Sequence, residues 1–389
     1  MERHRGRRRR AGRRDPTRPG PDPGASRRRR RAHRRPRAAP RSRVDPPHLT
    51  RILGIPTSWL AALVAAVLLS IGFAMMLGPE LLGPGRLLDL LRPVASDHPL
   101  DRLLFEWRLP RVLTAFMVGG LLGAAGAIFQ GIFRNPLADP FLIGTAPGAA
   151  LGATLALLVP GLALFQAVSP LLLLPILSFL GAFGATLGVL LLARLARVRD
   201  TAGLLLAGVA MAAFLGALRS YLMLALADET ISLQVVLSWT LGGIQTPFWR
   251  ELGYVALACL LLLAFARRLA HGLDVLGLGD DVARNMGLPV ERFVVMATLL
   301  ASALVALAVT WGGTIGFVGL IVPHLVRWTL GPRHAPLILT SALVGGILLT
   351  LLDGLARSLL PPAEIPLGLL TALIGAPFFM LILARRSRQ

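Results

Sequence analysis

The sequence RRLAHGLDVLGLGDDVARNMGLPVER, residues 267–292, is the one long polar stretch between the apolar segments of this chain. It is too polar to lie in lipid, so we expect it at a membrane surface. Arg267 and Arg268 follow directly after an apolar span, and cytoplasmic loops of membrane proteins carry an excess of arginine and lysine. The stretch therefore predicts a turn of the chain at the cytoplasmic surface.

The middle of this stretch has the pattern of a short helix. Asp280 is a suitable N-cap, and Val282 and Met286, four residues apart, would share one face. Gly287 suits the position after a helix end, and Pro289 prevents the helix from continuing. Two interpretations are open: a solvated connecting loop, or a surface element that docks a cytosolic partner.

Composition places the rest of the chain in a membrane. The 389 residues are 54% hydrophobic with a mean hydropathy of +0.67, and several apolar stretches are long enough to span a bilayer. The formal charge of +21 is concentrated in residues 1–51, which hold 20 arginines and four acidic residues and so carry +16. The membrane body is left near +5, so the overall charge is no sign of nucleic-acid binding.

Residues 1–51 are rich in Arg, Pro and Gly and have almost no apolar residue, so we predict a disordered cytoplasmic tail. Three interpretations compete: an anchor attracted to anionic lipid head groups, an upstream start-site artefact, and nucleic-acid binding. The last is disfavoured because no aromatic residue alternates with the arginines. A secretory signal fits poorly, since the apolar stretch that follows lacks a small-residue cleavage site.

Two absences limit the chemistry of the chain. It contains no lysine and therefore no phosphate-binding loop of the G-x-x-x-x-G-K-[ST] type, so any ATP hydrolysis must occur on another polypeptide. It has one cysteine, Cys259, so a disulfide within the chain is excluded. Because Cys259 lies in an apolar span, its thiol is most simply a small hydrophobic group.

Residues 52–389 are predicted to form one all-α transmembrane domain with about ten spans and with both termini cytoplasmic. The expected spans are 58–77, 111–133, 141–159, 170–193, 201–227, 249–266, 293–311, 314–330, 337–360 and 367–383. With this topology the basic loops all fall on one side. Residues 231–241 are too short to cross and suggest a re-entrant helix.

Glycine and proline are dense within the spans, which permits close helix packing and local breaks beside a cavity. The segments that begin with LPR at 109–111 and LPVER at 288–292 start on opposite sides and lead into similar helical runs. This pair suggests an inverted repeat.

Several motifs resemble a known family. They are RLPRVLTAFMVGGLLGAAGAIFQGIFRNPLADPFLIGTAPGAALGA (108–153), LLLAGVA (204–210), LGLGDDVARNMGLP (276–289), GGTIGFVGLIVPHLVRWTLGPRH (312–334) and DGLARSLLPPAEIPLGLLTALIGAPFFMLIL (353–383). In this order they resemble the permease subunits of ABC importers for iron chelates such as ferric siderophores, haem and cobalamin. The resemblance covers roughly residues 58–386.

The resemblance implies a ten-helix subunit in the bacterial cytoplasmic membrane that pairs with a second copy or a paralogous permease. Two cytosolic ATPase subunits, which bind ATP and Mg²⁺, would lie below it, and a periplasmic or lipid-anchored binding protein above it. The chain itself would be no enzyme and would hold no cofactor. The substrate stays open among a ferric siderophore, haem, cobalamin and an oxyanion such as molybdate.

The resemblance also assigns residues on the cytoplasmic side. The loop 267–289 would dock into the ATPase, and the segment 135–140, NPLADP, would support it from the same side. The coupling residues would then be Asp280, Asp281, Val282, Arg284, Met286 and Gly287.

Arg108, Arg111 and Arg357 lie at the outer ends of spans, against the positive-inside pattern. They could snorkel to the interface, with Asp353 and Arg357 an ordinary i,i+4 pair. The resemblance implies instead that these arginines pair with acidic residues of the binding protein and fix its register. We favour docking.

The fifth and tenth spans would line the central path, with small Thr201 and Ala202 at an inner gate. Arg219 lies nearer the outer end of the fifth span, where it would either snorkel or face the cavity and favour an anionic chelate.

Other functions fit the sequence less well. The histidines are widely spaced and no cysteine or carboxylate cluster accompanies them, which disfavours a metal site. No set of nucleophile, base and orienting residue is evident, which disfavours catalysis. A secondary transporter driven by an ion gradient would need intramembrane carboxylates, and Asp353 is the only one near the interior of a span. A receptor without transport activity is ranked lower still.

Overall fold

The computed structural model describes residues 57–78, 80, 82–83, 85, 102–158, 170–197, 201–226 and 239–386. Within these ranges the chain is helical and contains no strand. The predicted disordered tail, residues 1–51, lies outside the described residues, as does most of the predicted re-entrant segment 231–241.

The described chain contains eleven α-helices and two short helices of other types. They are α2 (Thr57–Met76), the π-helix η1 (Leu103–Arg108), α5 (Leu109–Ile132), the 3₁₀-helix η2 (Pro140–Ile143), α6 (Thr145–Leu158), α7 (Pro170–Leu195), α8 (Thr201–Leu226), α10 (Trp249–Leu276), α11 (Asp280–Asn285), α12 (Val290–Gly312), α13 (Val318–Leu330), α14 (His334–Ser358) and α15 (Leu367–Arg386).

Ten of these helices correspond to the predicted spans. Seven stretches are long and apolar enough to cross a membrane: α2, η1 with α5, and most or all of α7, α8, α10, α12 and α14. Three apolar helices are shorter, namely α6, α13 and the Leu367–Leu381 part of α15. The predicted all-α class with about ten spans is therefore confirmed, with ends shifted by a few residues at most helices.

One boundary was wrong by a larger margin. The polar surface stretch was predicted to begin at Arg267, but α10 continues to Leu276. The reason lies in its buried face, because Ala266, Ala270 and Leu273 follow one another at helical spacing and are 0 to 2% exposed. Packing of this face holds the helix together through a sequence that looks polar.

The start of α6 also differs from the prediction. Residues 140–143 form η2 and end at Gly144, whose φ of +79° is in the left-handed region that favours glycine. The Asp139 side chain caps η2 by accepting a hydrogen bond from the backbone N–H of Phe141 at 2.7 Å. The chain therefore turns before α6, which begins only at Thr145.

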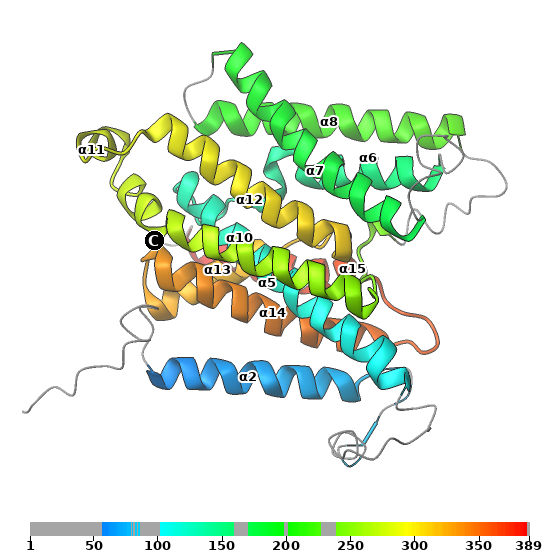
Figure 1. The fold of residues 1–389 in the computed structure, drawn as a ribbon. Helices are drawn as coiled ribbons and strands as arrows, with labels where there is room; N and C mark the ends of the chain where they lie inside the picture. Colours follow the sequence, from blue (N-terminus) through cyan, green and yellow to red (C-terminus); the bar gives the residue numbers. More distant parts are fainter. Residues whose placement is uncertain are drawn as a thin grey trace, which may run out of the picture. The chain divides into compact units, whose positions relative to one another are not determined.

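Helix α5 is the core of the bundle. It packs against α14, α12, α13 and α10, and from Val118 to Ile132 every residue of it is buried (Figure 1). Its glycines allow this close contact: a Cβ on Gly126 would collide with the backbone of Gly319 in α13, and one on Gly119 with the backbone of Gly345 in α14. Small residues at such crossings let helix backbones approach closely in lipid.

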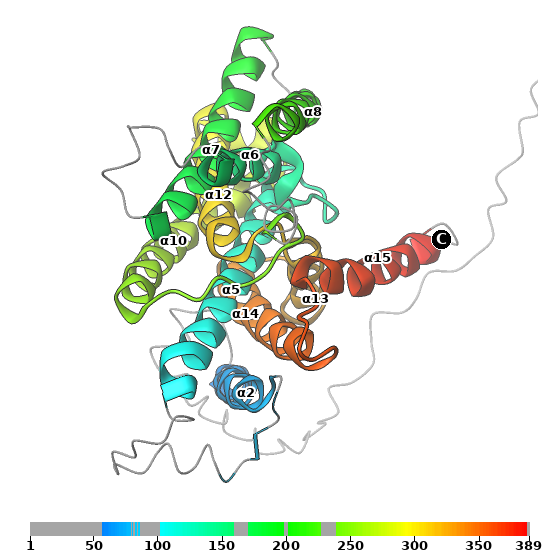
Figure 2. The same cartoon turned by 90° about the vertical axis from the view of Figure 1, so that its right-hand side faces the viewer.

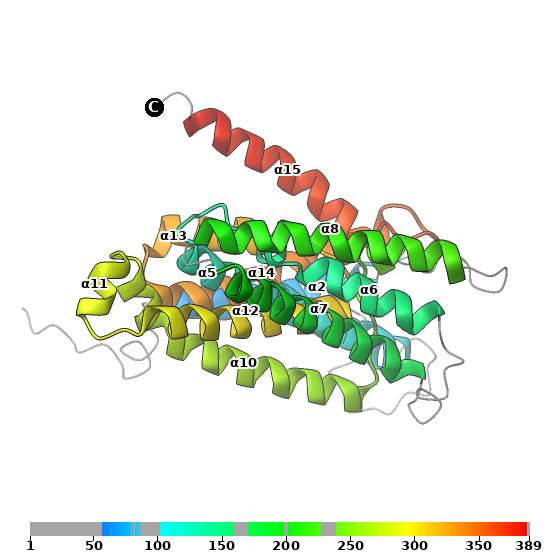
Figure 3. The same cartoon turned by 90° about the horizontal axis from the view of Figure 1, so that it is seen from above.

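Helices α8 and α15 lie toward one side of the bundle and α10 toward the other (Figures 2 and 3). In the most apolar window of α8, only 17% is buried. Large apolar side chains of both helices are uncovered, among them Phe214, Leu224 and Leu373, which are 63, 87 and 63% exposed. This side of the described chain therefore carries a broad apolar surface.

Candidate functional site

Helix α11 is a short surface helix between α10 and α12 (Figure 1). Gly279, with φ +108°, occupies its N-cap, and Gly287, with φ +86°, follows its C-cap Met286. The prediction of a short helix that ends at Gly287 is confirmed. The prediction that Asp280 is the N-cap was wrong: glycine alone takes this backbone conformation easily, so Asp280 becomes the first helical residue.

Two apolar side chains of α11 face outward. Val282 and Met286 are 45% and 59% exposed, whereas Ala283 between them is fully buried and holds the helix on the bundle. Asp281 is almost fully exposed, with 98% of its side chain accessible. The helix thus presents an apolar pair beside acidic groups, which is a suitable surface for contact with another protein.

Ion pairs hold α11 in place. Arg134, just after α5, pairs with Asp280 at 2.9 Å. The support of the loop by the neighbouring segment 135–140 stays a prediction. Arg284 pairs with Glu291 of α12 at 2.8 Å and with Asp281 at 3.4 Å. The hydrogen bond and the charge of Glu291 raise the pKa of Arg284 above its ordinary value.

The segment after α5 is tied down by its own side chains. Asn135 accepts a hydrogen bond from the backbone N–H of Leu137 at 2.9 Å, and Asp139 caps η2. Burial raises the pKa of Asp139 above its ordinary value, with the Phe141 hydrogen bond acting in the opposite direction. The loop therefore offers α11 an ordered neighbour.

A further polar contact joins α10 to α14 at the same end, and the sequence did not point to it. Asp274 accepts hydrogen bonds from the backbone N–H of His334 at 2.9 Å and contacts its Nδ1 at 2.7 Å. The two residues are 60 positions apart, so no local pattern joins them.

Within the described residues no group of three or more His, Cys, Asp or Glu side chains could hold a metal ion.

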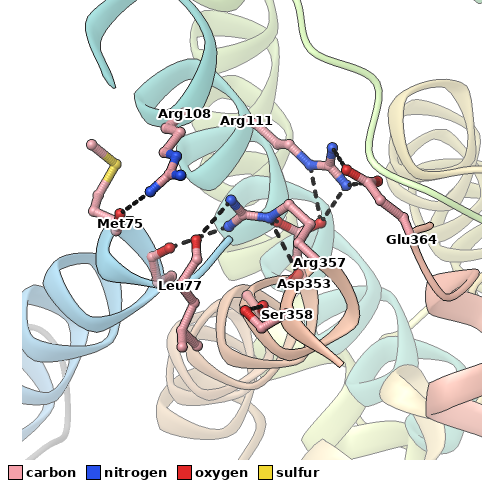
Figure 4. A network of polar contacts seen from close by, with 10 residues as sticks. Met75, Leu77, Arg108, Arg111, Asp353, Arg357, Ser358 and Glu364 are labelled. Carbon is pink, nitrogen blue, oxygen red and sulfur yellow. Dashed lines mark hydrogen bonds and ion pairs between the residues drawn. The ribbon is translucent and has the colours of Figure 1, made fainter. Parts of the chain in front are cut away.

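At the opposite end of the bundle, two of the three outer arginines, Arg111 and Arg357, form a network with two acids (Figure 4). Asp353 is 1% exposed and accepts hydrogen bonds from Arg111 at 3.1 Å and from Arg357 at 3.0 Å. Arg111 also pairs with Glu364 at 2.7 Å. The predicted i,i+4 pair of Asp353 and Arg357 is present, but it is one edge of a larger network.

Arg108 and Arg357 point into the protein. Arg108 is 7% exposed and donates to the carbonyl of Met75 at 3.2 Å, and Arg357 is 3% exposed and donates to the carbonyl of Leu77 at 3.1 Å. Both therefore fasten α2 and the residues after it to the bundle. Arg111, with 18% of its side chain accessible, is the most exposed of the three.

The predicted gate and path residues lie on α8. Thr201 and Ala202 begin this helix, and their side chains lie outside the described part of the chain. Arg219 donates from Nε to the hydroxyl of Thr154 at 3.0 Å and from Nη2 to the hydroxyl of Thr240 at 2.5 Å. It thus connects α8 with α6 and with the segment before α10.

Comparison with known proteins agrees with this architecture. Residues 62–385 match the model of the FecCD transport family. The Fe(3+) dicitrate transport system permease protein FecD of Escherichia coli is 38% identical over 297 residues, which is 76% of this chain and 89% of FecD. The cobalamin import system permease protein BtuC of Halobacterium salinarum is 39% identical over 284 residues, which is 72% of this chain and 73% of BtuC.

A solved structure shows the same fold. A metal-chelate type ABC transporter in an inward-facing conformation superposes with a TM-score of 0.71 at 33% identity, covering 84% of this chain and 99% of the other. The family model spans more than half of the chain, and the helices match the predicted spans. The chain is therefore a multi-pass membrane protein that belongs to the FecCD transport family of ABC importer permeases.

Proposed function

We propose that this chain is the permease subunit of a binding-protein-dependent ABC importer of the bacterial cytoplasmic membrane. It moves a ferric siderophore, or haem or cobalamin, across this membrane. Two partner subunits bind ATP and Mg²⁺ and hydrolyse the ATP that drives the transport. Both termini are cytoplasmic in this proposal, so the α11 end of the bundle faces the cytosol.

The observation that carries the proposal is helix α11. It exposes Val282 and Met286, and the ion pairs of Arg134 with Asp280 and of Arg284 with Glu291 fix it to the chain segment that directly follows α5 and to α12. A partner that pushes on α11 therefore moves helices that cross the membrane. In this arrangement Asp280, Asp281, Arg284 and Gly287 shape the contact, and the apolar pair forms its centre.

Two copies of the chain form the path in our proposal. The uncovered apolar side chains of α8 and α15 support it, because a surface of this kind lies either in lipid or against a second subunit. Thr201 and Ala202 then form the inner gate. A paralogous permease in place of the second copy fits the same surfaces.

We place the substrate-binding protein at the end with Arg108, Arg111 and Arg357. Among these, Arg111 has the most accessible side chain, and with Glu364 it forms a charged pair near the surface. Arg108 and Arg357 act on docking through the position of α2 and α14, which their buried hydrogen bonds hold. Charged groups at such a rim fix register and speed encounter.

The proposal is tested by the double substitution Val282→Asp and Met286→Asp. Two charges in the apolar centre of the contact should abolish co-purification of the ATPase and vanadate-sensitive uptake into vesicles, while the purified permease stays folded. The matched control is Leu359→Asp with Leu360→Asp, since these side chains are 52% and 60% exposed at the opposite end of the bundle. If both variants retain the ATPase equally, the assigned role of α11 is wrong.

An ion-gradient-driven secondary transporter is the alternative. It predicts uptake that stops when the proton or sodium gradient is collapsed and that continues in the presence of vanadate. Asp353, the residue such a mechanism would use, is engaged by two arginines, which argues against it as a carrier of a coupling ion.

A further inference from the structure

A groove of about 700 Å³ lies at the α11 end of the bundle, between the last turns of α7 and the first three turns of α12. Residues of α5, α8, α10 and α11 complete its lining. We call it the α7–α12 groove. It is separate from the exposed apolar face of α11, because neither Val282 nor Met286 lines it.

One end of the α7–α12 groove is basic. Four arginines and two carboxylates line it, so its lining has a net charge of +2. The carboxylates of Asp280 and Glu291 pair with Arg134 and Arg284. The other two arginines, Arg194 and Arg292, are exposed, and no acidic side chain within the described residues lies within 4 Å of either.

Arg292 is unusual because it lies in the first turn of α12, where the helix dipole disfavours a cation. Arg194 lies in the last turn of α7. Both arginines thus reach the mouth of one groove from different helices. A bound anion at this point would neutralise both side chains.

The rest of the groove is apolar. From Val290 to Leu299 the α12 part of the lining extends for about 14 Å, at 1.5 Å per residue, and Leu190 and Ala193 of α7 face it. One leaflet of the hydrocarbon core is about 15 Å thick, half of the bilayer's 30 Å. The groove therefore has a cationic mouth followed by an apolar channel of one leaflet's depth.

Exposed apolar side chains of α7 and α12 border the groove. Leu187 and Leu191 of α7 and Met296 of α12 are 47, 58 and 52% exposed, and large apolar side chains remain uncovered in a membrane protein where they meet acyl chains. A lipid can therefore enter from the side, without crossing a polar barrier.

From these observations we propose that the α7–α12 groove binds one anionic glycerophospholipid, with its phosphate between Arg194 and Arg292 and an acyl chain along α12 toward Leu299. Basic pockets between transmembrane helices are suited to anionic head groups. A neutral lipid would leave the net positive charge of the mouth uncompensated. This inference does not depend on the proposed transport function.

The test uses the purified full chain in nanodiscs of phosphatidylcholine with a photoactivatable phosphatidylglycerol, followed by mapping of the labelled peptides. We expect labels concentrated in residues 187–195 and 290–299, and competition by unlabelled phosphatidylglycerol but not by added phosphatidylcholine. Labels spread evenly over all spans, or equal competition by both lipids, would overturn the proposal.

Variants sharpen the test. Arg194→Gln with Arg292→Gln should weaken phosphatidylglycerol binding about 30-fold, because each arginine near a membrane surface contributes about fivefold. Arg194→Lys with Arg292→Lys should retain binding. The charge-matched control is Arg268→Gln with Arg333→Gln, two exposed arginines that do not line the groove. Equal weakening in both glutamine pairs would show nonspecific attraction and overturn the assignment.

Discussion

Asp353 is the most informative residue for testing what holds the outer end of the permease together. Its carboxylate is 1% exposed and joins two arginines, Arg111 at 3.1 Å and Arg357 at 3.0 Å (Figure 4). The perturbation is Asp353→Asn, which keeps the size of the side chain, removes its charge and replaces one acceptor oxygen by an NH₂ donor.

The magnitude follows from this geometry. One of the two guanidinium groups loses its acceptor and faces a donor instead. The buried Arg357 loses the carboxylate that compensates its charge, whereas Arg111 keeps Glu364. Removing one partner of a buried ion pair costs about 3 to 5 kcal/mol, because the remaining charge is left buried without compensation. We therefore expect Asp353→Asn to lower the free energy of unfolding by about 3 to 5 kcal/mol.

The assay is equilibrium unfolding of the purified full chain in detergent, and the control is Glu364→Gln. Glu364 pairs with the same Arg111 but its side chain is 45% exposed, so its loss should cost less than about 1 kcal/mol. If Asp353→Asn destabilises the protein no more than Glu364→Gln, the network does not carry the stability that its burial implies.

Three further predictions concern other contacts. Gly126→Ala should lower the free energy of unfolding by about 1 to 3 kcal/mol, because the new Cβ would collide with the backbone of Gly319. The control is Gly184→Ala, whose Cβ would meet nothing within 4 Å and which should be neutral or slightly stabilising. Thermal unfolding of both variants measures the difference. Arg219→Ala should lower the free energy of unfolding by about 1 to 3 kcal/mol, since two hydrogen bonds are lost. If the same variant takes up an anionic siderophore at an unchanged rate, Arg219 does not attract the substrate. Asp274→Asn should lower the free energy of unfolding by about 0.5 to 1.5 kcal/mol, because it weakens the contact with His334 that joins α10 to α14. An unfolding transition identical to that of the wild type would show that this contact adds no stability.

Local patterns in the sequence account for much of the fold. Apolar stretches of spanning length predicted the helices, because a backbone in lipid must satisfy its own hydrogen bonds. Gly287 and Pro289 predicted the end of α11, because glycine easily adopts the left-handed backbone at a helix end and proline prevents the helix from continuing. The motifs and the absence of lysine pointed to a permease that depends on a separate ATPase.

Of two predictions that failed, one depended on contacts distant in sequence and one on local backbone conformation. The buried face of α10 extends that helix to Leu276 because α5, α14 and α12 with its Phe293 pack against it, which the polar residues of 267–276 conceal. The N-cap of α11, by contrast, falls on Gly279 for a local reason, since the backbone there has a φ of +108° that only glycine adopts easily.

The sequence alone determined that this is a polytopic helical membrane protein, where its spans lie and to which family it is similar, because hydropathy and local backbone preference act over a few residues. Only the tertiary structure decided what the charged residues do. It buried Arg108 and Arg357 against carbonyls at the end of α2 and just after it, paired Asp274 with His334, and left Arg194 and Arg292 at the mouth of an apolar groove. The partner of a charge is chosen by helix packing between segments up to 283 residues apart, and no local pattern carries that information.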